Sequence, residues 1–223
     1  MLIDRKKNIK GIIFDFDFTL ADSSKGVIEC VNYALRKLGF TKFSDEKIKK
    51  TIGLTLEQTF IDLVGKQQLD KTEKFKHYFV ERADESMSDL TELFIETYSV
   101  IRLLHRKGIK LGIVSTKFRY RIINILERED LLDCFEVIIG GEDVKEHKPD
   151  PRGLLEAIKK LNLSVSQIIY VGDSLTDAET AFNAGVSFVA VLTGVTFQDK
   201  YKTYPDTKFL NNLSEIPELL NIT

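Results

Sequence analysis

Short continuous runs of apolar residues, rich in β-branched and aromatic side chains, recur along this chain. Runs that are apolar at every position, rather than at alternate positions, are typical of strands that are buried on both faces of a sheet. The runs that predict such strands are Gly11–Asp15, Leu111–Val114, Phe135–Ile139, Ile168–Val171 and Phe188–Leu192. The pattern therefore predicts a sheet that is covered by other elements on both faces.

Apolar stripes with helical spacing separate most of these strands. They lie over Val100–Leu104, which leads to a stop at Gly108, over Ile122–Leu126 and over Leu154–Leu161. Alternation of strands and helices is typical of a parallel sheet joined by right-handed crossovers. We therefore expect an α/β fold.

The interval between the first two strands breaks this alternation, because it contains no convincing strand. Only its last part, from about Glu92 to Lys107, is needed for a crossover helix. The rest is typical of helices over Val27–Leu38, Leu56–Val64 and Phe75–Ala83. We expect residues 23–88 to form an inserted helical subdomain, and residues 1–22 and 89–223 to form the α/β core. The alternative is one domain with overlong connections, which conflicts with the usual loop length of about 2–6 residues.

Composition excludes several classes of protein. Hydrophobic residues make up 43% of the chain and charged residues 30%, so a sizeable core and a solvated surface are both available. The net charge of -2 argues against a nucleic-acid or membrane surface as the main function. Cys30 and Cys134 are far apart and suggest neither a disulfide framework nor a zinc site. Without a signal peptide or an apolar stretch of roughly 20 residues, we expect a cytoplasmic protein, and its oligomeric state stays open.

Two carboxylates stand where the first predicted strand ends. Asp15 and Asp17 follow the apolar run Ile12–Phe14. Like charges this close raise each other's pKa, and a divalent cation would offset their repulsion. The alternative is an ordinary solvated turn that happens to carry two aspartates.

The other predicted strands also end in polar residues. These residues are Ser115, Thr116 and Lys117 after the second strand, Lys148 after the third, and Asp173 and Asp177 after the fourth. The carboxyl ends of parallel strands meet at one edge of a sheet, where ligands bind. Carboxylates suit Mg²⁺, whereas hydroxyls, lysines and free amides suit phosphate oxygens. This set of groups predicts phosphoryl transfer, in which a carboxylate can attack phosphorus and form an aspartyl-phosphate.

Each of these residues also has a structural interpretation. Thr176 and Glu179 have the spacing of a helix capping box, which would give Asp177 a place in the first helical turn. Lys148 could be an exposed loop lysine, and the two hydroxyls after the second strand could simply end it. The joint occurrence of all these groups favours the catalytic interpretation.

Four motifs occur in a fixed order. They are Asp15-x-Asp17-x-Thr19, Ser115-Thr116, Lys148-Pro149-Asp150-Pro151 and Gly172-Asp173-Ser174-x-x-Asp177. In this order they resemble the haloacid dehalogenase-like (HAD) hydrolase superfamily, and within it the phosphoglycolate phosphatase-like and pyrophosphatase-like branch. The resemblance implies a Rossmann-like α/β core with a small all-helical cap inserted after the first strand.

The resemblance also implies a role for each motif residue. Asp15 would be the nucleophile, and Asp17 the general acid and base. The phosphate-binding residues would be Ser115, Thr116 and Lys148, of which Lys148 is also catalytic. The Mg²⁺ ligands would be Asp15, Asp17 through its backbone carbonyl, Asp173 and Asp177, the last directly or through water. Many relatives have glycine where Phe18 stands, and we expect this ring to narrow the site.

The function implied is a Mg²⁺-dependent phosphatase that acts on a small phosphorylated metabolite similar to phosphoglycolate. Inorganic pyrophosphate or a sugar phosphate is the alternative substrate, and Lys117 could hold a second anionic group. Asp17 argues against a true dehalogenase, and Val27 stands where mutases of the β-phosphoglucomutase type have a histidine. A phosphonatase would need an imine-forming cap lysine, for which Lys25 is a conceivable candidate. A non-catalytic phospho-ligand sensor would be expected to lack one of the motif aspartates.

Overall fold

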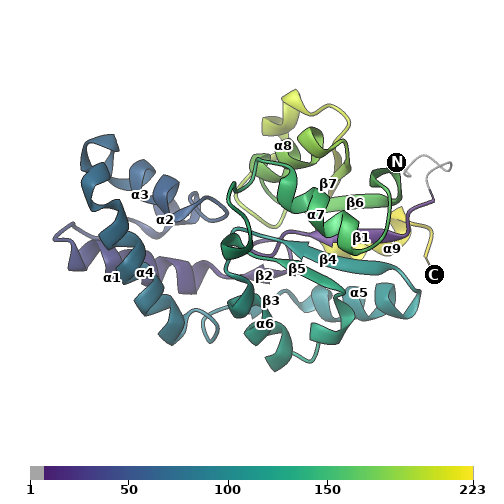
Figure 1. Ribbon diagram of the computed structural model, residues 1–223, viewed down its shortest axis with the longest axis horizontal. Helices are drawn as coiled ribbons and strands as arrows, with labels where there is room; N and C mark the ends of the chain where they lie inside the picture. The colour runs from purple at the N-terminus through teal and green to yellow at the C-terminus, as the bar shows by residue number, and fades with distance from the viewer. Residues whose placement is uncertain (1–7, 223) are drawn as a thin grey trace. The chain divides into compact units, whose positions relative to one another are not determined.

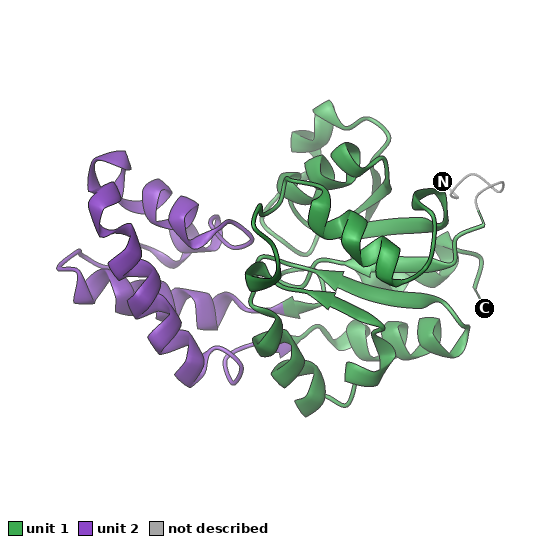
Figure 2. Ribbon diagram, viewed as in Figure 1, with its two compact units in different colours: residues 1–21, 93–223 green, residues 22–92 purple. Residues whose placement is uncertain are grey.

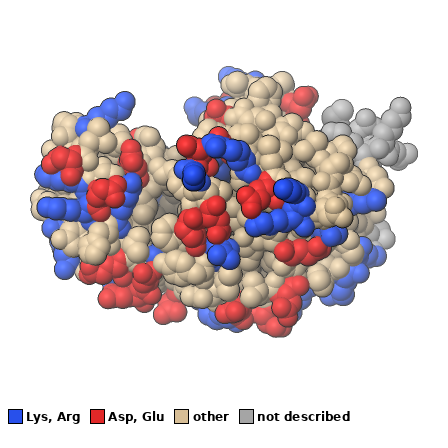
Figure 3. Space-filling view, in the orientation of Figure 1, with Lys and Arg blue, Asp and Glu red and all other residues tan. Residues whose placement is uncertain are grey.

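The computed structural model describes residues 8–222 and divides the chain into two compact units. The first unit comprises residues 1–21 and 93–223, and the second comprises residues 22–92 (Figure 2). The second unit is thus inserted into the sequence of the first. Basic and acidic side chains are interspersed on the face of the molecule viewed in Figure 3.

The first unit is built on a six-stranded sheet in which every neighbouring pair of strands is parallel. In spatial order the strands are β5 (Val137–Ile139), β4 (Lys110–Val114), β1 (Gly11–Phe14), β6 (Ile168–Gly172), β7 (Ser187–Val191) and β8 (Lys208–Leu210). The α/β fold class predicted from the sequence is confirmed. Strand β8 was not predicted, because it contains only two consecutive apolar residues, Phe209 and Leu210.

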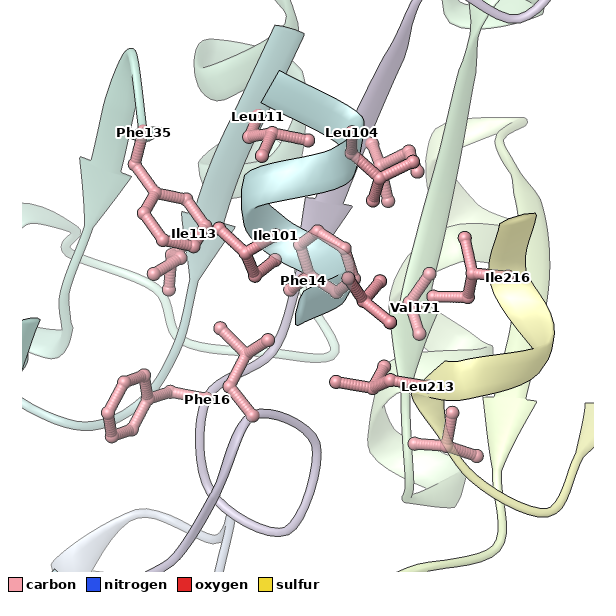
Figure 4. Close-up of a cluster of buried hydrophobic side chains, with 14 of the residues drawn as sticks. Phe14, Phe16, Ile101, Leu104, Leu111, Ile113, Phe135, Val171, Leu213 and Ile216 are labelled. Carbon is pink, nitrogen blue, oxygen red and sulfur yellow. The ribbon is translucent and has the colours of Figure 1, made fainter. Parts of the chain in front are cut away.

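Helices cover both faces of this sheet (Figure 1). One face packs against α7 (Arg152–Lys160) and α8 (Leu175–Ala184), and the other against α5 (Ile95–Arg106), α6 (Arg119–Arg128) and α9 (Ile216–Leu219). Side chains of β1 alternate between the two cores: Phe14 lies beside Ile101 and Val171 in the cluster of Figure 4, whereas Ile13 belongs to the opposite cluster. Tyr170, which pairs with Ile13 across β1 and β6, shares that opposite face.

Short 3₁₀ helices connect several of these elements. They are η1 (Lys66–Lys71), η2 (Leu132–Cys134), η3 (Gly141–Asp143), η4 (Val165–Gln167), η5 (Gln198–Thr203) and η6 (Leu213–Glu215). Among residues 8–222, no helix has the length and continuous apolar character that crossing a membrane requires.

The second unit is helical and has a core of its own. Its helices are α1 (Ser24–Lys37), α2 (Asp45–Lys49), α3 (Leu56–Val64) and α4 (Thr72–Ser86). Phe60 of α3 and Phe75 of α4 stack with their ring centroids 4.8 Å apart, and Val31 of α1 belongs to the same cluster. The chain enters and leaves the unit through β2 (Ala21–Asp22) and β3 (Glu92–Leu93), which form a two-stranded sheet. The short helix α2 was not predicted.

Candidate active site

Three buried carboxylates come together at the carboxyl ends of β1 and β6. Asp15 directly follows β1, Asp173 directly follows β6, and Asp177 lies in the first turn of α8. One oxygen atom from each of the three lies within 4.8 Å of the others, and all three side chains are buried. Because β1 and β6 are hydrogen-bonded neighbours, the sheet itself places two of these carboxylates side by side.

Burial and mutual repulsion make this cluster costly when every carboxyl is ionised. Burial raises the pKa of Asp15 against the lowering effect of Lys148, and with the added repulsion of Asp177 and Asp17 the pKa reaches about 6. Burial likewise holds the pKa of Asp173 well above its usual range, with Asp177 and Asp15 adding to the effect. A positive charge next to the cluster would therefore stabilise the ionised carboxylates.

Lys148 supplies part of that charge. Its Nζ lies 3.0 Å from Asp15 Oδ1 and 2.6 Å from Asp177 Oδ1, and its side chain is only 4% exposed. Burial acts to lower the pKa of Lys148, but the Asp15 and Asp177 carboxylates outweigh it and hold the pKa well above its usual value. The structure thus places Lys148 in the carboxylate cluster and not on an exposed loop.

Asp17 lies beside this cluster and forms a separate ion pair with Lys117. Lys117 Nζ donates a hydrogen bond to Asp17 Oδ1 at 2.8 Å, and both side chains are buried. Lys117 also lies over the ring of Phe16, 5.9 Å from its centroid. The contact between Lys117 and Asp17 was not predicted, because the two residues are a hundred positions apart in the sequence.

The two hydroxyl residues lie where β4 ends. The Ser115 N–H donates to the carbonyl of Ile139 at the end of β5, and Ser115 Oγ accepts a hydrogen bond from the backbone of Lys117. Ser115 is buried, and Thr116 next to it is half-buried, with its carbonyl packed against Gly141. Both are on the edge of the sheet that carries Asp15.

The capping box of α8 differs from the prediction. The helix begins at Leu175, with Ser174 as its N-cap, and Asp177, not Glu179, is the acidic partner in the box. Ser174 Oγ accepts from the Asp177 N–H at 3.1 Å, and Asp177 Oδ2 accepts from the Ser174 N–H at the same distance. The predicted Thr176–Glu179 pairing was wrong by two residues, because Ser174 precedes the first helical residue and Thr176 does not.

Phe18 adopts a backbone conformation that L-residues rarely occupy. Its φ is +59°, in the left-handed region, and its carbonyl accepts a hydrogen bond from Thr193 Oγ1. Glycine adopts this conformation without strain, whereas phenylalanine does so at an energetic cost. The side chain of Phe18 is buried.

Three residues that lie against Asp173 and Asp177 were not predicted from the sequence. Tyr201 donates from its hydroxyl to the Asp173 carbonyl at 2.7 Å. Gly194 lies so close to Asp173 that a Cβ atom there would overlap the Asp173 carboxylate. Tyr170 donates to Asp177 Oδ1 at 2.9 Å. A tyrosine in an otherwise apolar buried strand was the one available hint, since a buried hydroxyl usually has a polar partner.

The donor set fits a hard divalent cation. Its members are carboxylate oxygens, the ligands that Mg²⁺ prefers. Asp15 Oδ1 is buried and has no aligned hydrogen-bond donor among residues 8–222, although Lys148 lies within ion-pairing distance of it. An oxygen of this kind, in a cluster where burial raises the pKa of Asp15 and of Asp173, is available as a ligand.

Known proteins resemble this chain over most of its length. Residues 12–191 match the family described as haloacid dehalogenase-like hydrolase. The chain belongs to this family. It is 30% identical to the phosphoglycolate phosphatase of Salmonella typhimurium, over 87% of this chain and 86% of that enzyme. The family and these relatives indicate a phosphatase, a phosphoric monoester hydrolase.

Solved structures of the same family show the same fold. A protein of Bacteroides fragilis assigned to the haloacid dehalogenase-like hydrolases is 42% identical and superposes with a TM-score of 0.90, covering 93% of this chain and 99% of its own. A protein of Haemophilus somnus assigned as a phosphoglycolate phosphatase is 26% identical, with a TM-score of 0.84, and covers 96% of this chain and 99% of its own.

Proposed function

We propose that this hydrolase is a Mg²⁺-dependent phosphatase that cleaves a small phosphorylated metabolite through an aspartyl-phosphate intermediate. The observation that carries the proposal is the position of Asp15, which lies buried at the end of β1 between Lys148 and the carboxylates of Asp173 and Asp177. A nucleophilic carboxylate needs a neighbouring cation that offsets the charge of the incoming phosphate, and this site offers one from Lys148.

In the first step an Asp15 oxygen attacks phosphorus, the new Asp15–phosphorus bond forms, and the bond from phosphorus to the leaving oxygen breaks. Asp17 gives its proton to that oxygen. In the second step Asp17 takes a proton from water, the water oxygen bonds to phosphorus, and the bond to Asp15 breaks. Inorganic phosphate leaves, and both aspartates return to their starting states.

The remaining residues bind and neutralise charge. Ser115 and Thr116 would donate hydrogen bonds to the transferring phosphoryl group, and Lys148 would neutralise it together with Asp15. A Mg²⁺ ion would be held by Asp15, by the Asp17 carbonyl, by Asp173 and by Asp177, the last directly or through water. Bound there, the ion would stabilise negative charge on the phosphoryl oxygens.

The substrate that we propose first is a compact phosphorylated acid similar to phosphoglycolate, because the curated relatives carry that activity in their names. Inorganic pyrophosphate or a small sugar phosphate is the second choice. The helical unit, residues 22–92, would select the leaving group, as the cap does in the family that the sequence resembles. We expect a protein of the cytoplasm that acts on metabolites and not on nucleic acids.

The alternative of an imine-forming phosphonatase is disfavoured by the state of Lys25. Imine formation requires a neutral amine, whereas Lys25 is exposed and its Nζ lies 2.9 Å from Glu92 Oε1. The hydrogen bond and the charge of Glu92 raise the pKa of Lys25. An ammonium held in this way is a poor nucleophile.

The proposal is tested by measuring phosphate release from phosphoglycolate, pyrophosphate, a sugar phosphate and a phosphopeptide, with Mg²⁺ and with EDTA. We expect turnover that EDTA abolishes and Mg²⁺ restores, with the highest kcat/KM for a small ester. Full activity in EDTA would contradict the metal assignment. A preference for the phosphopeptide would contradict the choice of substrate class.

A further inference from the structure

Tyr170 is buried in the middle of β6, yet its hydroxyl lies among the groups of the active site. The side chain is completely buried, and the residue belongs to none of the four sequence motifs. Its backbone pairs with Ile13 of β1, two residues before Asp15. The ring therefore lies under the carboxyl ends of the strands, on the face of the sheet covered by α7 and α8.

The hydroxyl of Tyr170 contacts three separate segments of the chain. It donates to Asp177 Oδ1 at 2.9 Å or to the Val114 carbonyl at 3.1 Å, and it accepts from Lys148 Nζ at 3.3 Å. Val114 is the residue before Ser115 at the end of β4, and β4 is separated from β6 by β1. A single oxygen thus connects the end of β4, the loop that carries Lys148 and the first turn of α8.

Tyr170 provides one of the oxygens that surround the Lys148 ammonium. An ammonium group has three N–H donors. Three oxygens lie close to Nζ: Asp177 Oδ1 at 2.6 Å, Asp15 Oδ1 at 3.0 Å and the Tyr170 hydroxyl at 3.3 Å. Two of them belong to carboxylates, and the Tyr170 hydroxyl is a neutral acceptor that also bonds to Asp177 Oδ1. Without the hydroxyl, Lys148 would lose its neutral acceptor, and Asp177 Oδ1 would lose a donor.

We propose that Tyr170 is a positioning residue, whose hydroxyl holds Lys148 against Asp15 and fixes the orientation of Asp177. It touches neither the substrate nor the reacting atoms. The inference rests on the proposed function for its catalytic consequence, but the arrangement of Lys148 can be tested without turnover. Groups that orient the residues in direct contact with a site commonly contribute about 10–100-fold to activity.

The kinetic test compares Tyr170→Phe with a matched variant, Tyr98→Phe. Tyr98 also has a hydroxyl bonded to a carboxylate, Glu129 Oε2 at 2.7 Å, but it lies on α5, which packs on the other face of the sheet. We expect Tyr170→Phe to lower kcat about 10–100-fold while KM stays within about twofold of the wild-type value. Tyr98→Phe should keep wild-type kcat. Wild-type kcat in Tyr170→Phe, an effect confined to KM, or an equal loss in Tyr98→Phe would overturn the proposal.

The second readout does not need activity. The side-chain ¹⁵N resonance of Lys148, identified by its loss in Lys148→Arg, should show slow hydrogen exchange in the wild-type protein and in Tyr98→Phe, and faster exchange in Tyr170→Phe. In the wild-type protein alone, the Tyr170 hydroxyl proton should be slowly exchanging and close to the Lys148 ammonium. Absence of that contact would overturn the proposal even if Tyr170→Phe did not fold. If the wild-type protein hydrolysed no phosphate ester, the proposed function would fail while this arrangement would still be tested.

Discussion

Asp15 and Asp17 stand two residues apart but have different neighbours. Asp15 is close to Lys148 and to the carboxylates of Asp173 and Asp177, whereas Asp17 is paired with Lys117. The two aspartates therefore face different cations although they follow the same strand. The roles that we propose for them also differ, a nucleophile for Asp15 and a proton donor for Asp17.

Substitution of each aspartate by asparagine should separate these roles. Asp15→Asn removes the nucleophile, so we expect no phosphoenzyme and essentially no turnover. Asp17→Asn keeps the nucleophile but removes the proton donor, so we expect a loss of about 10²–10⁴-fold in kcat. Acid quenching with labelled substrate measures the phosphoenzyme, and label trapped on Asp15→Asn would place the nucleophile elsewhere.

Lys117→Met should destabilise the fold through Asp17. Both side chains of the pair are buried, so removal of the cation leaves the Asp17 carboxylate without its partner. Breaking a buried ion pair on one side costs about 3–5 kcal/mol in the free energy of unfolding. The matched variant Lys117→Met/Asp17→Asn removes both charges and should recover most of that loss in urea unfolding. No difference between the single and double variants would show that the pair is solvated.

Gly194→Ala should weaken the cation site without changing a ligand. A Cβ atom at position 194 would overlap Asp173 Oδ2, so the carboxylate must move. We expect Mg²⁺ affinity, measured by calorimetry, to fall about 10–100-fold. The control is Gly153→Ala in α7, where the nearest heavy atom would be a Val144 methyl at 3.4 Å. Unchanged Mg²⁺ affinity in Gly194→Ala would argue that Asp173 does not hold the ion.

At the scale of single elements, the start of α8 determines where Asp177 lies. Ser174 caps the helix, and Asp177 Oδ2 accepts a hydrogen bond from the Ser174 N–H. The other oxygen, Asp177 Oδ1, contacts Lys148 and Tyr170. Asp177 thus stabilises the start of the helix through Oδ2 and contacts the candidate active site through Oδ1. The stability of α8 and the position of Lys148 are linked through this side chain.

Ser174→Ala should cost about 0.5–2 kcal/mol of stability, as expected when an N-cap hydroxyl is lost. Thr176→Ala, at the position first expected to cap the helix, should change the free energy of unfolding much less. Thermal or urea unfolding of the two variants compares them directly. A larger loss of stability in Thr176→Ala than in Ser174→Ala would instead support the capping box of Thr176 and Glu179 that the sequence predicts.

The elements that the sequence predicted are those with a strong local pattern. The continuous apolar run before Asp15 and the helical stripe over Leu154–Leu161 both coincide with elements of the structure, β1 and α7. Strand β8 contains only two consecutive apolar residues, and the five residues of α2 form little more than one helical turn, so neither has a pattern that could be recognised. Motif residues could be predicted as a set because each follows a predicted strand.

Contacts between distant residues could not be predicted in this way. The pairing of Lys117 with Asp17 and the hydroxyl of Tyr201 on the Asp173 carbonyl depend on how loops fold back over the sheet. A single sequence shows that these residues are present, but it does not show which residue each one contacts in the folded protein. The positive φ of Phe18 likewise could not be predicted, because phenylalanine has no preference for the left-handed region.

For the molecule as a whole, the carboxylate cluster links stability to pH and to metal. The raised pKa of Asp15, about 6, means that the folded protein holds this proton more tightly than the unfolded chain, whose aspartates titrate near 4. Asp15 therefore stabilises the metal-free fold below about pH 4, and that contribution is lost as the pH rises through about 6.

Mg²⁺ should reverse this loss, because the ion binds the ionised carboxylates. We expect Mg²⁺ to raise the melting temperature more at about pH 7.5 than at about pH 5, where protons compete for Asp15. Differential scanning fluorimetry at both pH values, with and without Mg²⁺, measures the difference. An equal shift at both pH values would mean that Asp15 is not among the groups that bind the ion.

The central position of β1 has a consequence for synthesis on the ribosome. β1 is the first strand of the sheet to be made, but its neighbours β4 and β6 follow only at residues 110–114 and 168–172. The helical unit, residues 22–92, is contiguous and has its own core, so it is complete in the nascent chain before either neighbour exists. Domains generally fold as units during synthesis, and unpaired apolar strands are prone to aggregate. The nascent chain must therefore carry an unpaired, wholly apolar β1 on the N-terminal side of the helical unit until β4 emerges.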